Sequence, residues 1–170
     1  MIVELKDIFK SYSEGEDNPR RNILDSFNLL INFDESISIV GPSGCGKTTL
    51  LNILGTLDKP DSGEVIFKGE LVTHMNDDQL SKLRAEKIGF IFQSHYLLPQ
   101  ISVIENVILP TLAVNRKQNN SIIFDEAESL LSQVGLKKQA HKFPSQLSGG
   151  EKQRVAIVRS LINKPNLVLA

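Results

Sequence analysis

The sequence predicts an α/β fold, because segments with the alternating pattern of strands are interspersed with segments that have the helical period. A β-branched run at residues 36–40 leads into the glycine-rich residues 41–48, and a helical pattern follows at residues 50–57. A strand, a glycine-rich turn and a helix in this order are typical of a phosphate-binding loop. We therefore expect an α/β fold that contains a phosphate-binding loop.

The amino-terminal third predicts an antiparallel β subdomain. Residues 1–6 alternate apolar and polar side chains, and residues 23–33 alternate enough for a second strand. After the helix at residues 50–57, which stops in the turn-forming residues 58–63, residues 64–67 form a third strand with a turn at 68–70.

The rest of the chain predicts mainly helices. Capping boxes at residues 76–79 and 102–105 open two helices, and Pro110 breaks the second. Between them, residues 88–92 form a short buried strand that ends at Gln93. The last residues, 165–170, again have a buried-strand pattern.

Residues 121–126 allow two interpretations. They resemble an aliphatic strand that ends in the acidic pair Asp125 and Glu126, which would suit a magnesium and water-activating site. However, the apolar residues continue with the 3.6-residue period of a helix that ends at Gly135. We therefore predict a helix with the acidic pair in its first turn, and we reject the catalytic interpretation.

The glycine-rich loop predicts that the chain binds a nucleoside triphosphate with Mg²⁺. Its residues match G-x-x-x-x-G-K-[ST], namely Gly41, Pro42, Ser43, Gly44, Cys45, Gly46, Lys47 and Thr48. The glycines let successive backbone N–H groups surround one anion, and the helix N-terminus favours negative charge. Lys47 supplies a charge for the β- and γ-phosphates, and Thr48 offers a hydroxyl to Mg²⁺.

A second anion site is predicted at the start of the helix over residues 155–162. Ser148, Gly149 and Gly150 precede it, and a serine with two glycines leaves N–H groups open to a close neighbour. The alternative, an ordinary flexible helix cap, remains open.

Composition argues against several classes of protein. A formal net charge of −1 does not favour nucleic acid as the main partner. We find no apolar run near the ~20 residues of a membrane-spanning helix and no signal-peptide pattern, so we expect a soluble chain that faces the cytoplasm. The single cysteine, Cys45, cannot form an intrachain disulfide, and we interpret it as a small filler residue.

Together these motifs resemble the nucleotide-binding subunits of ABC transporters, and the resemblance covers essentially the whole chain. Residues 41–48 match the family's phosphate loop, Gln93 its glutamine loop, and residues 147–151 its LSGGQ-type motif, with Glu151 replacing the usual glutamine. The variant and the segment 89–107 are most similar to the branch of lipoprotein-releasing LolD ATPases, MacB-type exporters and FtsE division proteins, and among these to LolD. The resemblance implies a P-loop NTPase fold with a central mixed sheet flanked by helices. It also implies one nucleotide-binding domain over residues 1–170, with a helical subdomain at about residues 94–158 that carries the LSGGE motif.

The resemblance implies roles for individual residues. Tyr12 would stack on adenine, Thr49 would join the loop residues at the nucleotide, and Gln93 would sense Mg²⁺ and the γ-phosphate. The LSGGE residues would contact ATP bound to the other subunit of a homodimer; they are Leu147, Ser148, Gly149, Gly150 and Glu151. Integral membrane subunits would complete a transporter on the cytoplasmic side of the bacterial inner membrane, where the chain would be peripheral.

The resemblance also implies residues that the sequence does not contain. The family's magnesium aspartate, catalytic glutamate and γ-phosphate histidine would lie beyond Ala170, so we expect a truncated domain that binds nucleotide weakly and hydrolyses little, whereas the full-length protein is an ATPase. An FtsE-like regulator, a MacB-type export ATPase and a soluble ABC protein without a membrane partner remain alternatives to a lipoprotein-release subunit.

Overall fold

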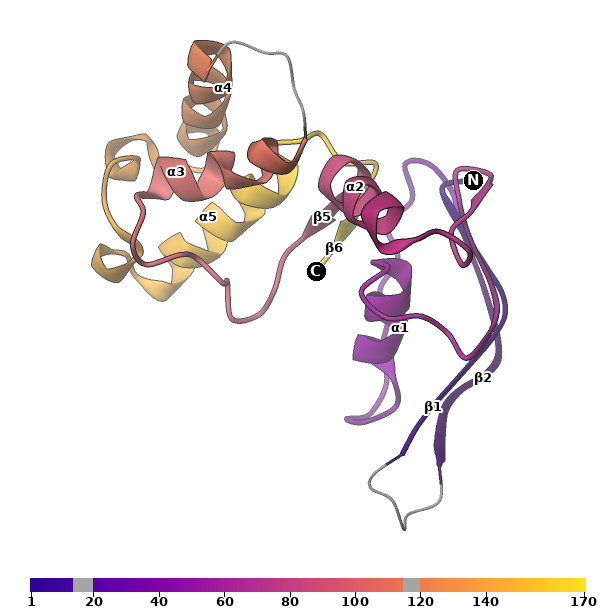
Figure 1. The fold of residues 1–170 in the computed structure, drawn as a ribbon. Coiled ribbons are helices and arrows are strands. Elements are labelled where there is room, and N and C mark those ends of the chain that lie inside the picture. Colours follow the sequence, from indigo (N-terminus) through magenta and orange to yellow (C-terminus); the bar gives the residue numbers. More distant parts are fainter. Residues whose placement is uncertain (14–19, 115–119) are drawn as a thin grey trace. The chain divides into compact units, whose positions relative to one another are not determined.

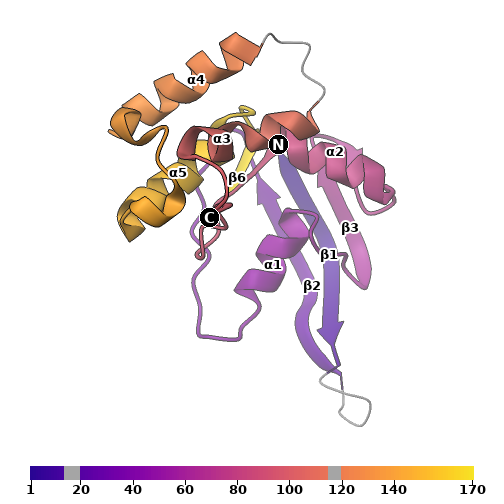
Figure 2. The ribbon, with the colours of Figure 1, turned by 60° about the vertical axis from the view of Figure 1, so that its left-hand side comes forward.

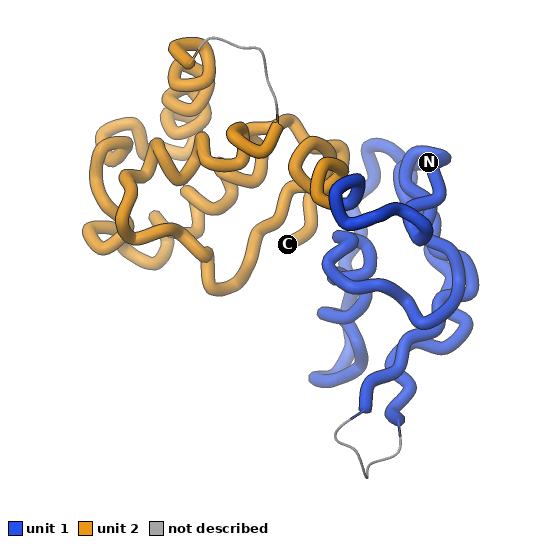
Figure 3. The backbone as a smooth tube through the Cα atoms, viewed as in Figure 1, with its two compact units in different colours: residues 1–80 blue, residues 81–170 orange. Residues whose placement is uncertain are grey.

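A computed structural model of the chain describes residues 1–13, 20–114 and 120–170. These residues form two compact units, Met1–Leu80 and Ser81–Ala170, shown in blue and orange in Figure 3. The predicted helical subdomain, residues 94–158, falls within the second unit.

The first unit contains a four-stranded antiparallel sheet in the order β2-β1-β3-β4. Figure 1 labels β1 and β2, and Figure 2 shows β1 between β2 and β3. Its strands are β1 (Val3–Tyr12), β2 (Arg21–Ile31), β3 (Ser62–Phe67) and β4 (Glu70–Leu71). The predicted antiparallel β subdomain is thus confirmed. The first strand is longer than expected, because it pairs with β2 on one side as far as Tyr12 and with β3 on the other.

Helix α1 (Lys47–Leu54) lies along one face of this sheet (Figure 2). It buries Leu50, Ile53 and Leu54, which follow the i, i+3, i+4 spacing of a single helical face. Buried side chains of the sheet complete the core of the first unit: Val3, Leu5, Ile8, Leu24, Ile31, Val65 and Phe67. The helix that follows the glycine-rich loop is therefore anchored on a packed sheet.

The predicted strand at residues 36–40 is wrong. These residues have no regular secondary structure, and Ile37 and Val40 are 43% and 84% exposed. A strand requires a neighbour that accepts and donates its ladder hydrogen bonds, and no strand among the described residues pairs with this run. The β-branched residues indicate that the backbone of this segment favours an extended conformation. Whether it pairs with another strand depends on the rest of the fold.

The second unit is mainly helical. Its helices are α2 (Asp77–Lys87, which begins within the first unit), α3 (Val103–Ile108), α4 (Asn120–Gln133) and α5 (Gly149–Leu161), with short 3₁₀ turns η1 (Leu109–Ala113), η2 (Lys137–Gln139) and η3 (Pro144–Gln146). Strands β5 (Ile88–Phe90) and β6 (Leu167–Leu169) pair in parallel. The expected central sheet is represented among the described residues by this pair alone. No helix of the described ranges is long and apolar enough to cross a membrane.

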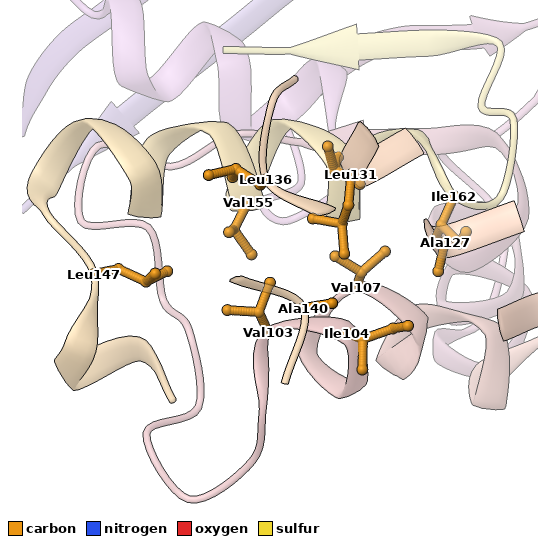
Figure 4. Packing of buried hydrophobic residues seen from close by; sticks show 11 residues of the cluster. Val103, Ile104, Val107, Ala127, Leu131, Leu136, Ala140, Leu147, Val155 and Ile162 are labelled. Atoms are coloured by element: carbon orange, nitrogen blue, oxygen red, sulfur yellow. The ribbon is translucent and has the colours of Figure 1, made fainter. Parts of the chain in front are cut away.

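Helices α3, α4 and α5 enclose the core of the second unit (Figure 4). The buried cluster contains only apolar side chains: Val103, Ile104, Val107, Ala127, Leu131, Leu136, Ala140, Leu147, Val155, Val158 and Ile162. Both predicted capping boxes are present, since the Asn76 and Gln79 side chains each accept from the other's backbone N–H at 2.9 Å and Ser102 and Glu105 do the same. Local sequence therefore determined where these helices begin.

Residues 121–126 are helical, as predicted. The helix already runs from Asn120, so Asp125 and Glu126 lie beyond its first turn rather than within it. Glu126 forms an ion pair with Lys164, with 2.6 Å between Oε1 and Nζ. An ion pair within the unit accounts for this carboxylate, in agreement with the non-catalytic interpretation.

Candidate functional site

The glycine-rich loop brings its backbone close to strand β2. Gly46 has φ +96° and precedes helix α1, and a Cβ built on it would come within 2.6 Å of Ile23 Cγ2. Both the left-handed conformation and the lack of space require glycine at this position. The loop therefore turns immediately before the N-terminus of α1, and the position of Gly46 has no room for a side chain.

The Lys47 ammonium is bound by the loop itself. Its Nζ donates to the carbonyl oxygens of Gly41 at 2.9 Å and Pro42 at 2.8 Å and lies 3.8 Å from Cys45 Sγ. An ammonium has three donors and no acceptor, so these contacts place a positive charge across the loop. A phosphate oxygen would replace neutral acceptors with a charged one, which makes a stronger hydrogen bond.

Several donors of the loop remain for an anion. Among the described residues, the backbone N–H groups of Gly44, Gly46, Lys47 and Thr48 have no hydrogen-bond acceptor. The Thr48 side chain is exposed. N–H groups at a helix start, one ammonium and one hydroxyl are groups that suit a polyphosphate. The role of Thr48 toward Mg²⁺ stays a prediction. The exposed Pro42 and Ser43 complete the loop.

Tyr12 is the last residue of β1, and its side chain is 39% exposed. Its hydroxyl donates to Asp58 Oδ2 at 2.5 Å and is hydrogen-bonded by the Thr49 side chain. Burial, followed by the bond to Asp58, raises the pKa of the Tyr12 phenol. The ring predicted to stack on adenine is thus attached to the first turns of α1, next to the phosphate-binding loop.

Lys10 and the acidic residues that surround Tyr12 were not predicted from the sequence. Lys10 Nζ lies 2.8 Å from Asp58 Oδ1 and 3.7 Å from Asp61 Oδ1. Burial opposes the charge of Lys10, but the hydrogen bond to Asp58 and the two carboxylates outweigh it and raise the lysine pKa. The available signal was the i, i+2 spacing of Lys10 and Tyr12, which places both on one face of a strand.

Gln93 lies in the turn that follows β5, and its side chain is exposed. The next residues, His95 and Tyr96, both have left-handed backbones, with φ +62° and +46°. Arg159 of α5 holds this turn, because its guanidinium donates to the carbonyl oxygens of His95 at 2.5 Å and Tyr96 at 2.6 Å. The role of Gln93 toward Mg²⁺ stays a prediction.

Helix α5 begins with a complete capping box. Ser148 N and Oγ both donate to Glu151 Oε2 at 2.8 Å, and Glu151 N donates back to Ser148 Oγ at 3.3 Å. The Ser148 backbone N–H, followed by its hydroxyl, lowers the pKa of the Glu151 carboxyl. Ser148 and Glu151 therefore act as a helix cap in the isolated chain, and their expected contact with ATP on the other subunit stays a prediction.

The glycines of the same motif are open. Gly149 and Gly150 are exposed, and within the described part of the chain their N–H groups have no acceptor. Leu147, by contrast, is only 6% exposed and belongs to the core of the second unit. The Leu147 side chain packs inside, because burial of an apolar side chain of that size is favourable. Its expected contact with ATP on the other subunit stays a prediction.

A family model described as "ABC transporter" matches residues 24–170 of the chain. The chain belongs to the ABC transporter family. The match includes the phosphate loop, Gln93 and the α5 motif, whereas Tyr12 and Lys10 precede it. The α/β fold class with an antiparallel subdomain is that of ABC cassettes, since the solved ATP-binding cassette MJ0796 bound to ADP and Pi superposes with a TM-score of 0.91 at 42% identity. That superposition covers 99% of this chain and 73% of the cassette.

Curated relatives carry one recurring name. The lipoprotein-releasing system ATP-binding protein LolD of Geobacter metallireducens is 44% identical to this ABC chain. The LolD protein of Rickettsia bellii is 47% identical to it. Each alignment covers 99% of this chain and 73% or 72% of the relative, respectively. A second structure, titled as a dimeric structure of MJ0796, a bacterial ABC transporter cassette, matches with a TM-score of 0.91 at 41% identity.

Proposed function

We propose that this chain is the ATP-binding subunit of an ABC transporter that couples ATP binding and hydrolysis to lipoprotein release from the inner membrane. It binds ATP and Mg²⁺, pairs with a second copy, and sits peripherally on integral membrane subunits at the cytoplasmic face. The phosphate-binding loop carries the nucleotide part of this proposal, and the LolD relatives carry the lipoprotein part.

The single observation that best supports nucleotide binding is the arrangement of donors around Lys47. Its ammonium is held by the loop carbonyls of Gly41 and Pro42, and the N–H groups at the start of α1 are left without acceptors among the described residues. When bound, ATP with Mg²⁺ supplies a polyphosphate whose charge these donors match. Lys47 then moves its hydrogen bonds from carbonyls to phosphate oxygens, and Thr48 offers its hydroxyl to the metal.

Pairing of two copies is supported by the solved cassettes, whose titles describe dimers. In our proposal Gly149 and Gly150 offer their N–H groups to the nucleotide of the partner copy, while Ser148 and Glu151 hold the helix start in shape. Gln93 and Thr48 share the Mg²⁺ role, and the open glycines let the two surfaces approach closely.

Nucleotide binding is tested by titration calorimetry with ATP and Mg²⁺ on the whole chain. Lys47→Ala should weaken binding on the order of 100-fold, since an ammonium at about 4 Å from a phosphate charge contributes up to about 4 kcal/mol at an effective dielectric of 20. Lys82→Ala is the matched control, because Lys82 is exposed on α2. Equal ATP affinity of the Lys47 and Lys82 variants would overturn the proposed nucleotide site.

Lipoprotein release needs a separate experiment. The chain is isolated from its native membrane with whatever integral subunits it binds, and ATP-dependent transfer of a lipoprotein from reconstituted vesicles to a soluble acceptor is measured. Release that depends on Lys47 supports the proposal. Co-isolation with cell-division or drug-export subunits, without lipoprotein transfer, would assign the chain to the FtsE or MacB alternative instead.

A further inference from the structure

The aromatic ring of Tyr12 is fixed in place by a buried lysine. Lys10 is only 8% exposed, and its Nζ lies 5.1 Å from the centroid of the Tyr12 ring. The same Nζ donates to Asp58 Oδ1 at 2.8 Å and to the carbonyl oxygen of Lys59 at 2.7 Å. Asp58 in turn accepts from the Tyr12 hydroxyl through its other oxygen. Lysine, carboxylate and phenol therefore form a closed ring of contacts.

This arrangement ties the end of β1 to the loop after α1. Ser11 donates through its N–H and its hydroxyl to Asp61 Oδ2 at 2.8 and 2.9 Å, and Asp61 N donates to the Phe9 carbonyl oxygen at 2.9 Å. The contacts of this network connect residues 46 to 52 positions apart in the sequence. Because each contact restrains both backbones, the Tyr12 side chain cannot rotate without breaking the Asp58 bond.

The burial of the Lys10 side chain has a free-energy cost that must be offset by other interactions. Burying an ammonium is unfavourable unless it is paired and hydrogen-bonded, and a strand could be closed at lower cost with an apolar residue. Here the ammonium lies over one face of an aromatic ring, an attractive geometry, while Tyr12 as a residue stays 39% exposed. The pair thus presents a rigid, electron-rich ring whose remaining surface is accessible.

We propose that Lys10 and Asp58 are positioning residues that hold the Tyr12 ring as a platform for the base of the bound nucleotide. This inference rests on the proposed ATP binding and adds to it the residues that orient the base. Lys10 covers one ring face, Asp58 fixes the hydroxyl, and the base stacks on the face that remains. Neither residue contacts the base itself, so their effect is confined to ligands that carry one.

The test compares Mg²⁺-ATP with Mg²⁺-tripolyphosphate, which lacks a base. The variant Lys10→Met/Asp58→Ala removes the ammonium and the acceptor of the Tyr12 hydroxyl without changing the formal charge, whereas Asp58→Asn would keep one acceptor oxygen. The matched control, Lys6→Met/Glu4→Gln, removes another ion pair of the same strand, with 3.4 Å between Lys6 Nζ and Glu4 Oε2. Base–aromatic stacking is worth enough for the first variant to lose about 5- to 30-fold in ATP affinity. Its tripolyphosphate affinity, and both affinities of the control, should change less than about 2-fold.

Three results would contradict the proposals, and they differ from one another. If the unmodified chain binds neither ligand, the proposed function fails. If it binds both and the Lys10/Asp58 variant keeps its ATP affinity, the positioning role is overturned. An equal loss for both ligands also overturns it, because the network would then act on the phosphate site or the fold.

A spectroscopic measurement reports on the ring directly. The chain has two tyrosines and no tryptophan. In a Tyr96→Phe background, phenol absorbance therefore follows Tyr12 alone. Burial and Asp58 raise the pKa of Tyr12, so the Lys10→Met/Asp58→Ala variant should titrate at lower pH than its parent. An unchanged titration curve would show that the network does not hold the ring, whatever the binding data.

Discussion

Asn106 is the buried polar residue whose removal should cost the most stability. Its side chain on α3 is 0% exposed. The two N–H groups of Nδ2 are shared among the carbonyl oxygens of Leu98 at 3.0 Å, Ile101 at 3.2 Å and Ser102 at 3.0 Å, and Oδ1 accepts from Leu98 N at 2.7 Å. One amide thereby satisfies the backbone of the irregular segment between the Gln93 turn and α3.

Asn106→Ala should lower the free energy of unfolding by about 3–5 kcal/mol. A net hydrogen bond contributes about 0.5–1.5 kcal/mol, and the bonds of two N–H groups and one amide oxygen are lost while their backbone partners stay shielded from water, which adds a desolvation cost of about 1–3 kcal/mol for an unsatisfied group. A loss of this size is a large fraction of the about 5–15 kcal/mol that stabilises a typical domain. Asn106→Asp keeps the acceptor for Leu98 N but directs a carboxylate at carbonyl oxygens, so it should be at least as destabilising at neutral pH and partly recover on protonation.

Urea unfolding followed by circular dichroism measures both variants, with the unfolding slope checked for constancy. Gln100→Ala is the matched control, because this amide lies in the same segment and is exposed. It should change the free energy by less than about 0.5 kcal/mol. A loss below about 1 kcal/mol for Asn106→Ala would refute the reasoning, since the backbone groups would then have found other partners.

Three further predictions test other parts of the structure. Arg159→Lys should speed backbone amide hydrogen exchange in the turn after β5 by about tenfold, because one ammonium cannot reproduce the planar guanidinium that donates to two successive carbonyls. Unchanged exchange would mean that the turn is stable without the guanidinium. Gly63→Ala should lower the free energy of unfolding by about 2 kcal/mol in urea titration, because φ is +98° and its Cβ would come within 2.5 Å of a backbone oxygen of β1. The Ser11 N–H lowers the pKa of Asp61 below its ordinary 3.8, so the carboxylate stabilises the fold above that value and the contribution disappears as the pH falls through the lowered pKa. Asp61→Asn should therefore flatten acid unfolding between about pH 5 and pH 2, and an unchanged profile would exclude this contribution.

Local motifs of the sequence were predicted best. The capping boxes at Asn76 and Ser102 and the helical nature of the segment around Asp125 are confirmed, since each depends on residues within one or two helical turns. The prediction of a strand at residues 36–40 was wrong, because strand pairing depends on residues distant in the sequence. The burial of Leu147 in the core of the second unit was likewise not predicted, because the motif alone does not say on which side of the backbone the core lies.

The sequence by itself determined the phosphate-binding loop, the start of each capped helix and the family, because spacing over a few residues carries that information. Only the tertiary structure showed that Lys10 and Asp58 contact the Tyr12 side chain and that Arg159 donates hydrogen bonds to backbone carbonyls in the segment that follows Gln93. These contacts join residues 46 to 64 positions apart, and their geometry arises from the register of a sheet and the packing of a helix. A residue type such as lysine is compatible with both an exposed and a buried position, so its role depends on the elements that the folded chain places around it.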